Sequence, residues 1–376
     1  DQYWLGAPNL LQTSGGNGNL IQALARSAPS TRPAYISFPF DLFPSGDSDL
    51  LPFLLAGMPG AAISTIVQPP ESHTMAESAA VVNPGSIQQA GNQILALVRT
   101  LGSQPTLAVS VPDQTYFPVL GRLGHYPVSL AWPLAALAGL AFLGTTAYGL
   151  RKRALTWRGL GWGFLALILS LLFCALIVNL IWPGIKSLHP EYGYAVGRPD
   201  ESDDYLYTMG FAALALAVIL SSIALARKKI TSLDLAAGVL AIWLLIMIAA
   251  TILLPASSYL FTWLLLINSL ALLLALAVRA SKQGWILSGL GSLVAAILST
   301  FLWVPWVTNA ILAGPSNAGF LMVSLPVLAS AAWFGSMIPA LDWITAPRRR
   351  PWTTAAFLVA LGILAAGHFL VGKDTP

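Results

Sequence analysis

Beyond Val128 the sequence is built from long apolar runs separated by short polar loops. A helix needs about 20 apolar residues to cross the ~30 Å hydrocarbon core of a bilayer, so each run predicts one transmembrane helix. Only 9% of the whole chain is charged, against about 25% in an ordinary soluble domain. We predict eight spans, at 128–150, 160–182, 205–226, 233–254, 257–278, 284–304, 316–341 and 352–371.

The basic residues of this region gather in alternate loops. Twelve of the 19 Lys and Arg residues lie in the loops after the first, third, fifth and seventh spans. Short loops rich in Lys and Arg stay in the cytoplasm, so these four loops are predicted to be cytoplasmic. The residues ahead of Val128 and the carboxyl terminus are then expected outside the cytoplasm.

The residues ahead of Val128 do not form long apolar runs. Their most informative stretch is a predicted helix with two acidic residues before it and a histidine after it. Asp47 and Asp49 precede an apolar helical run that Gly57 terminates. Residues 61–67 are apolar and rich in Ile and Val, as in a strand buried on both faces. His73 follows this strand, and open α/β sheets keep their sites at the carboxyl ends of their strands.

Other elements complete an α/β pattern. A glycine-rich turn at 14–18 opens a helix, residues 34–38 are a short strand candidate, and Pro84 lies near the start of another helix. The fold class predicted for residues 1–120 is half of an α/β/α sandwich, and residues 121–376 form an all-α membrane domain. Asp1 is not Met and no signal peptide precedes it, so we expect the carboxyl-terminal part of a longer protein. Ile87, Ala90, Ile94, Leu97, Val98 and Leu101 predict one buried face on the last helix of this half.

Few side chains can carry chemistry. His73, with carboxylates nearby, is a candidate hydrolytic or metal site, whereas His125 is expected on the surface before the first span. A catalytic zinc takes about three protein ligands, which one histidine does not supply.

The spans hold no charged residue near a midplane, so Asn179 and Asn268 are expected to join helices rather than carry ions. Nothing resembles a basic, aromatic-rich nucleic-acid surface.

Several ordered motifs resemble a known family. They are LLQTSGGNG at 10–18, DSDLLPF and AGMPG within 47–60, His73-Thr74, and NPGSIQQAG at 83–91. The set is similar to the back half of a zinc aminopeptidase-type metallopeptidase. The nearest branch is membrane-embedded and includes endoplasmic reticulum and vacuolar membrane metallopeptidases with their bacterial relatives.

The resemblance implies a two-zinc site that hydrolyses peptide bonds with a metal-activated water. It assigns His73 as the last histidine ligand and Asp1 as the penultimate Asp/Glu ligand. Asp49, with Asp47, is assigned a place beside the site, facing the substrate or the ligands. The remaining ligands and the general-base glutamate belong to segments expected ahead of Asp1, so the 376 residues alone are expected to be inactive.

Two departures from the family keep other functions open. Met75 and Glu77 stand where the family has Pro after His-Thr and then an Asp. A degenerate peptidase-like binding module on a membrane scaffold is therefore the second hypothesis. A transporter with an accessory outer domain is a third, disfavoured by the uncharged spans. The partners expected for the leading hypothesis are a peptide substrate and the lipid bilayer.

Overall fold

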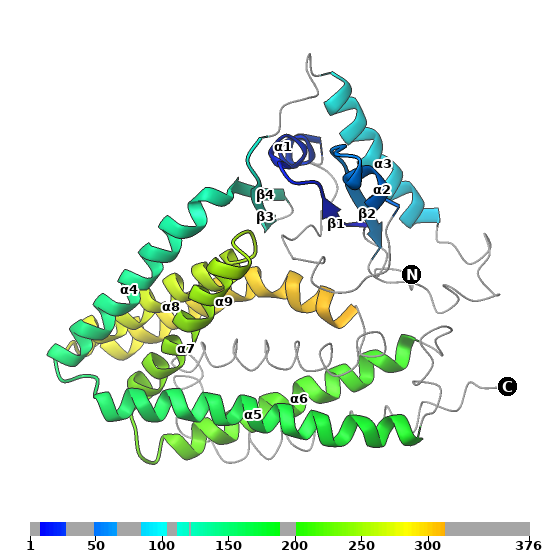
Figure 1. Ribbon diagram of the computed structural model, residues 1–376. Helices are drawn as coiled ribbons and strands as arrows, with labels where there is room; N and C mark the ends of the chain where they lie inside the picture. Colours follow the sequence, from blue (N-terminus) through cyan, green and yellow to red (C-terminus); the bar gives the residue numbers. More distant parts are fainter. Residues whose placement is uncertain are drawn as a thin grey trace. The chain divides into compact units, whose positions relative to one another are not determined.

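The computed structural model describes residues 8–27, 49–65, 84–103, 111–119, 122–188 and 201–312 (Figure 1). The chain divides into two units, each described by itself. The first unit comprises Asp1–Glu71, Met75–Ala136 and Met247–Thr262, and the second Ser72–Thr74, Leu137–Ile246 and Trp263–Pro376.

A two-stranded sheet and two helices begin the first unit. β1 (Pro8–Thr13) pairs antiparallel with β2 (Ala61–Thr65). α1 (Gly18–Ser27) packs against α3 (Pro84–Gly102). The helices predicted after the glycine-rich turn and at Pro84 are thus confirmed. Their shared core is made of Leu10, Ile21, Ala23, Leu24, Leu97, Tyr116 and Leu123.

β2 is less buried than its sequence predicts. The strand itself is confirmed, but Ala61, Ala62 and Ile63 are half-buried. Among the described residues its sheet contains only β1 and β2. An apolar, β-branched run is found in parallel sheets that are covered on both faces. It is also found in small antiparallel sheets that are only partly covered, so the composition of this strand does not distinguish the two kinds of sheet.

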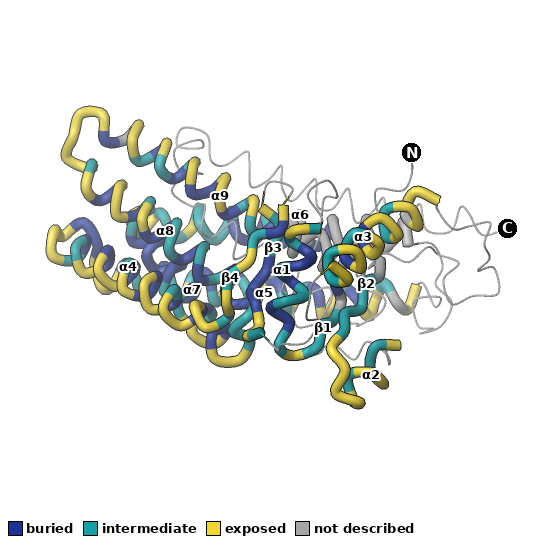
Figure 2. The backbone as a smooth tube through the Cα atoms, turned by 90° about the horizontal axis from the view of Figure 1, so that it is seen from above, coloured by how far each residue is buried: buried dark blue, intermediate teal, exposed yellow. Residues whose placement is uncertain are grey.

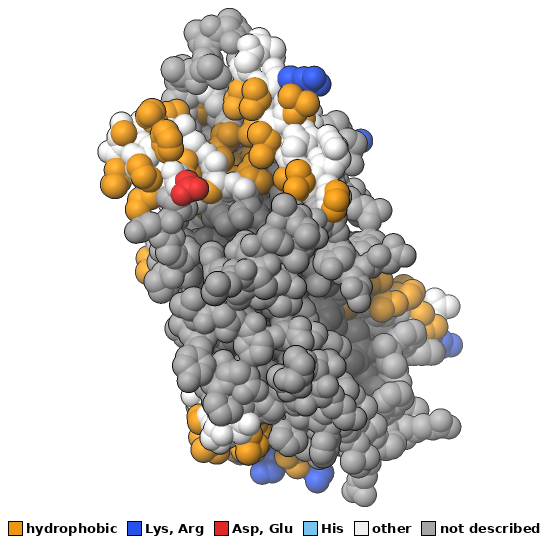
Figure 3. Space-filling view, turned by 90° about the vertical axis from the view of Figure 1, so that its right-hand side faces the viewer, with side chains coloured by type: hydrophobic (Ala, Val, Ile, Leu, Met, Phe, Trp, Pro, Cys, Tyr) orange, Lys and Arg blue, Asp and Glu red, His pale blue; other side chains and the backbone are white. Residues whose placement is uncertain are grey.

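The predicted buried face of α3 is correct only along a narrow stripe. Gln93 and Leu97, one turn apart, are buried against the core. Ile87, Ile94 and Val98 are 61%, 45% and 58% exposed, so their predicted burial is wrong. The apolar stripe is wider than the surface that faces it. Figure 3 shows hydrophobic side chains gathered over this part of the molecule.

A hairpin in the first unit precedes the long apolar helices. β3 (Gln114–Val119) pairs antiparallel with β4 (Arg122–Pro127), from which the chain continues through a short 3-10 turn, η2 (Val128–Leu130). No strand is predicted here from the sequence. Phe117 stacks on Tyr259, the first residue of α8, with ring centroids 4.7 Å apart, and both residues belong to the first unit.

The described residues beyond this hairpin form six long helices. Among the described residues, five helical segments are long and apolar enough to cross a membrane, namely Val128–Arg151, Trp157–Ile185, Ser232–Leu253, Tyr259–Val278 and Ile286–Trp303. They coincide with the first, second, fourth, fifth and sixth predicted spans. The third lies within α6, where the apolar part is Ala213–Ala226, and the last two lie outside the described residues. The helices are α4 (Ala131–Arg151), α5 (Trp157–Leu188), α6 (Glu201–Ala226), α7 (Ser232–Leu253), α8 (Tyr259–Val278) and α9 (Gly284–Leu312).

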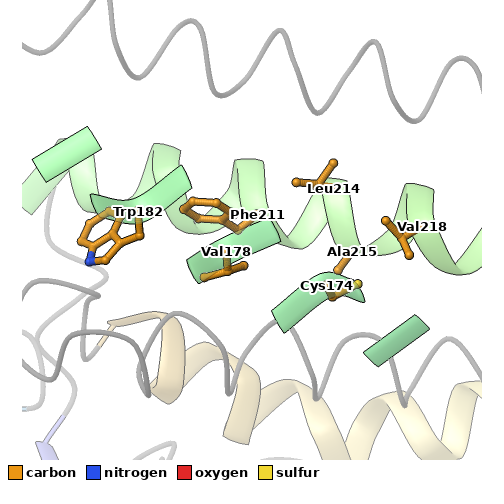
Figure 4. Packing of buried hydrophobic residues seen from close by; sticks show 7 residues of the cluster. All are labelled: Cys174, Val178, Trp182, Phe211, Leu214, Ala215 and Val218. Atoms are coloured by element: carbon orange, nitrogen blue, oxygen red, sulfur yellow. The ribbon is translucent and has the colours of Figure 1, made fainter. Parts of the chain in front are cut away.

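α5 and α6 interlock through side chains one turn apart. Trp182 of α5 meets Phe211 of α6 edge to face, with ring centroids 6.3 Å apart. Figure 4 shows these rings at one end of a row that continues along both helices. The chain's one cysteine, Cys174, is buried in this row and acts as an apolar side chain. The row consists of Cys174, Val178, Trp182, Phe211, Leu214, Ala215 and Val218.

α7 is the most buried of the five candidate spans. In its most apolar stretch 61% of residues are buried, against 22% for α5 (Figure 2). Its approach to α5 depends on glycine. A Cβ at Gly238 would lie 2.5 Å from the backbone nitrogen of Phe164 and 2.6 Å from the carbonyl oxygen of Leu160. Small residues of this kind let two membrane helices pack backbone to backbone.

The buried carboxylate of Asp234 fastens the amino-terminal ends of α5 and α7. Its Oδ1 accepts a hydrogen bond from the backbone N–H of Thr156 at 2.8 Å. Its Oδ2 accepts one from the Thr231 hydroxyl at 2.9 Å, and that hydroxyl accepts the Asp234 N–H at 3.1 Å. The Thr231 hydroxyl thus accepts the N–H three residues later, as an N-cap side chain does at the start of a helix. One side chain therefore satisfies donors at two helix ends.

Replacing Asp234 with alanine is expected to destabilise the second unit by about 3 kcal/mol, because it leaves buried donors without acceptors. Asp234→Asn keeps one carbonyl oxygen and should lose less. Unfolding of the purified chain in detergent, followed by circular dichroism, measures both. Equal stability of wild type and Asp234→Ala would show that this junction does not hold the helices.

Candidate functional site

The structure describes one of the four predicted site residues. Asp1, Asp47 and His73 lie outside the described residues. Asp49 is described, and it is exposed in the turn directly before α2 (Leu51–Leu55). No hydrogen bond or ion pair joins its carboxylate to another residue that the structure describes.

Local sequence explains how Asp49 is placed. α2 begins with Pro52 in its first turn, where the missing N–H costs no hydrogen bond. Its last helical residue is Leu55, and the chain turns away at Gly57, which has φ of +74°, a conformation that glycine adopts without the strain of a side chain. The helix predicted between Asp49 and Gly57 is therefore confirmed, with the expected terminator.

Two hydrogen bonds, one to the backbone and one to a side chain, join the residue after β1 to the residue before β2. The N–H of Ser14 donates to the carbonyl of Gly60 at 2.9 Å, and the N–H of Gly60 donates to the Ser14 hydroxyl at 3.2 Å. Gly60 also lies against Leu50, where a Cβ would come within 2.6 Å of the leucine Cδ1. The turn carrying Asp49, the β1–α1 turn and the start of β2 are consequently held together.

A second polar cluster joins α1 to the β3–β4 hairpin. The N–H of Asn17 donates to Asp113 Oδ1, and the N–H of Gln114 donates to Asn17 Oδ1, both at 2.9 Å. The buried Gln114 presents Oε1 to His125 Nδ1 at 3.1 Å. The exposed His125 is therefore held by a partner that its sequence position did not reveal. Asn17 Nδ2 also donates to Thr13 Oγ1.

The described residues form no metal site by themselves. Within them, no three His, Cys, Asp or Glu side chains come together closely enough to hold an ion. Both residues that the resemblance assigns to zinc, Asp1 and His73, lie outside. Imidazole and carboxylate are suitable zinc ligands, so the assignment of His73 and Asp1 stays a prediction.

Polar residues inside the candidate spans connect helices. Asn268 Nδ2 donates to Ser299 Oγ at 3.0 Å, linking α8 to α9, as predicted for this residue. Thr145 Oγ1 donates to the Ser269 carbonyl at 3.4 Å, linking α4 to α8. Asn179 instead bonds the carbonyl of Ala175 in its own helix and is exposed, so it joins no helices among the described residues.

A cavity between α5, α6 and α7 has a volume of about 10 Å³, roughly one water molecule. It is lined by apolar side chains together with Ser170 and Ser222. A cavity of this volume is too small for a peptide.

No family model, no curated protein and no solved structure matches this chain. The architecture by itself establishes a mainly helical protein with several helices that could span a membrane. Small antiparallel sheets accompany them in the first unit.

Proposed function

We propose that the chain is part of a membrane-anchored, zinc-dependent exopeptidase that removes amino-terminal residues from peptides. The observation that carries the proposal is the order of the elements around Asp49. An exposed carboxylate precedes a short helix, Gly57 ends that helix, and β2 then leads toward His73. The same order runs through the motifs on which the family resemblance rests.

The residues of this chain have separate roles in the proposal. Zinc, when bound, supplies a Lewis acid that activates water at neutral pH and polarises the scissile carbonyl. His73 provides an imidazole nitrogen to the metal, and Asp1 a carboxylate. Asp49 orients a ligand or binds the free amino group of the substrate, which is positively charged at neutral pH. The exposure of its carboxylate supports this role.

The test is peptide hydrolysis by the polypeptide as its gene encodes it, including any residues ahead of Asp1. Purified in detergent, it should release the amino-terminal residue of an unblocked peptide and leave an acetylated peptide intact. Chelation should abolish the activity and added zinc should restore it. Activity that survives complete chelation would contradict the proposal.

We further propose that the first unit faces away from the cytoplasm while the basic loops face it. The single cysteine makes this testable. In a Cys174→Ser background, Gly91→Cys on α3 and Arg153→Cys after α4 place thiols at exposed positions. A membrane-impermeant maleimide added to intact cells should label position 91 at once and position 153 only after permeabilisation. The reverse order would refute this orientation.

A non-catalytic binding module is the second candidate function, and the exposed apolar surface of the first unit favours it. Phe53 and Leu55 of α2 are 53% and 80% exposed, and Ile87 and Val98 of α3 are also exposed. Apolar surface of this kind is typical of protein-protein contacts. Peptide binding without hydrolysis, unchanged by chelation, would identify this function instead.

A further inference from the structure

The second unit carries a strongly basic end. The α4–α5, α6–α7 and α8–α9 loops meet there (Figure 1). A Cβ at Gly149 near the end of α4 would contact Leu276 near the end of α8. The Thr156–Asp234 hydrogen bond brings the start of α7 to this same end of the unit. The basic residues of this end are Arg151, Lys152, Arg153, Arg158, Arg227, Lys228, Lys229, Arg279 and Lys282.

Acidic residues do not balance these charges. Among the described residues of the three loops and their flanking helical turns, Asp234 is the one acid. It is 3% exposed, and both its oxygens accept hydrogen bonds from within the unit. The surface at this end therefore has a field that attracts anions.

Within this surface one group has a defined geometry. Lys229 Nζ lies 5.4 Å from the centre of the Trp162 ring, a cation–π distance. Arg158 precedes Trp162 by four residues on α5 and so shares its helix face. All three side chains are exposed. One cation thus lies over the indole and a second shares its helix face, and no carboxylate among the described residues pairs with either.

The same face of α5 continues as an apolar stripe. Leu165, Leu169, Leu172 and Leu176 follow Trp162 at helical spacing and are 40%, 54%, 61% and 53% exposed. A phosphate bound by Arg158 and Lys229 would therefore lie at one end of an apolar surface. A phospholipid, which joins a phosphate to acyl chains, fits this arrangement better than a free anion does.

We propose that Arg158, Trp162 and Lys229 bind the phosphate of an anionic phospholipid headgroup, with an acyl chain along the leucine stripe. The inference rests on α5 spanning a membrane and not on the peptidase function. Trp at the interface fixes the depth of the headgroup, and the guanidinium and ammonium groups donate to its phosphate oxygens. A zwitterionic lipid is bound less well because its own cation competes.

The test is lipid binding by the full chain in detergent. Phosphatidylglycerol, phosphatidylcholine and inorganic phosphate are titrated separately and binding is followed by native mass spectrometry. Phosphatidylglycerol should bind tightest. An Arg158→Gln/Lys229→Gln variant should bind it about 30-fold more weakly, a factor of about five per basic residue.

The matched control is Arg279→Gln/Lys282→Gln, which removes two charges from the same end. It should weaken binding by less than about fivefold, since each distant charge acts only through the screened surface field. Equal losses in the two variants would overturn the defined site in favour of a diffuse charge effect. Inorganic phosphate binding as tightly as phosphatidylglycerol would overturn the assignment to lipid. Both variants change exposed side chains, and circular dichroism checks that their helices form.

Discussion

Replacing His73 with alanine is expected to lower kcat/KM for peptide hydrolysis more than about 100-fold, beyond the ~10–100-fold cost of losing an outer partner of a metal site. The physical reason is loss of a nitrogen ligand, which weakens the hold on a metal that activates water and polarises the carbonyl. The measurement is initial-rate hydrolysis by the gene-encoded polypeptide, with the zinc content of each preparation determined alongside.

The matched control is His125→Ala, which removes the other histidine ahead of the first span. His125 is exposed and its ring contacts Gln114, so the variant should fold and keep near-wild-type kcat/KM. Similar activities of the His73→Ala and wild-type proteins would remove His73 from the chemistry. Equal losses in both variants would point to a general effect on the first unit.

Enlarging Gly238 to alanine is expected to destabilise the second unit by about 3 kcal/mol, the upper end of ordinary overpacking costs. The added Cβ would meet backbone atoms of α5 at 2.5 Å and 2.6 Å, and backbone cannot move aside as a flexible side chain can. The helices must separate, which also strains the Thr156–Asp234 hydrogen bond near their ends. Unfolding in detergent, followed by circular dichroism, gives the stability difference.

Gly161→Ala on α5 is the control. Gly161 is exposed, and a Cβ there would have no atom within 4 Å. Alanine has the higher helix propensity, by up to about 1 kcal/mol, so this variant should be as stable as wild type or slightly more stable. A Gly238→Ala protein as stable as Gly161→Ala would show that α5 and α7 do not approach this closely.

The sequence predicted the long apolar helices well because length and hydropathy are strong, local signals. The described spans begin and end within a few residues of the predicted ones, as α7 at Ser232–Leu253 does against 233–254. The same holds for α2, where Gly57 acts as the expected terminator. Such features depend on residues within one turn of each other.

Features that depend on distant partners were not predicted. The β3–β4 hairpin is stabilised by Phe117 stacking on Tyr259, which lies 142 positions later in the chain. Asp234 was not singled out because its partner Thr156 belongs to another loop. The exposure of Ile94 on α3 depends on how much surface faces that helix, which periodicity does not report.

The candidate site was predicted from the order of motifs in the sequence, and the structure describes only one of its four residues. Asp49 is described and exposed, and its place beside the site stays a prediction. His73, Asp47 and Asp1 remain assignments by resemblance, since they lie outside the described residues. Conversely, the contact between Gln114 and His125 emerged only from the structure, because a hairpin brings the two together.

Metal analysis of the gene-encoded polypeptide, purified without added metal or chelator, tests the central proposal most directly. The proposal predicts two zinc ions per chain in the wild type and clearly less zinc in His73→Ala. A correctly folded wild-type protein that contains no zinc, and takes up none at micromolar zinc concentrations, would contradict it.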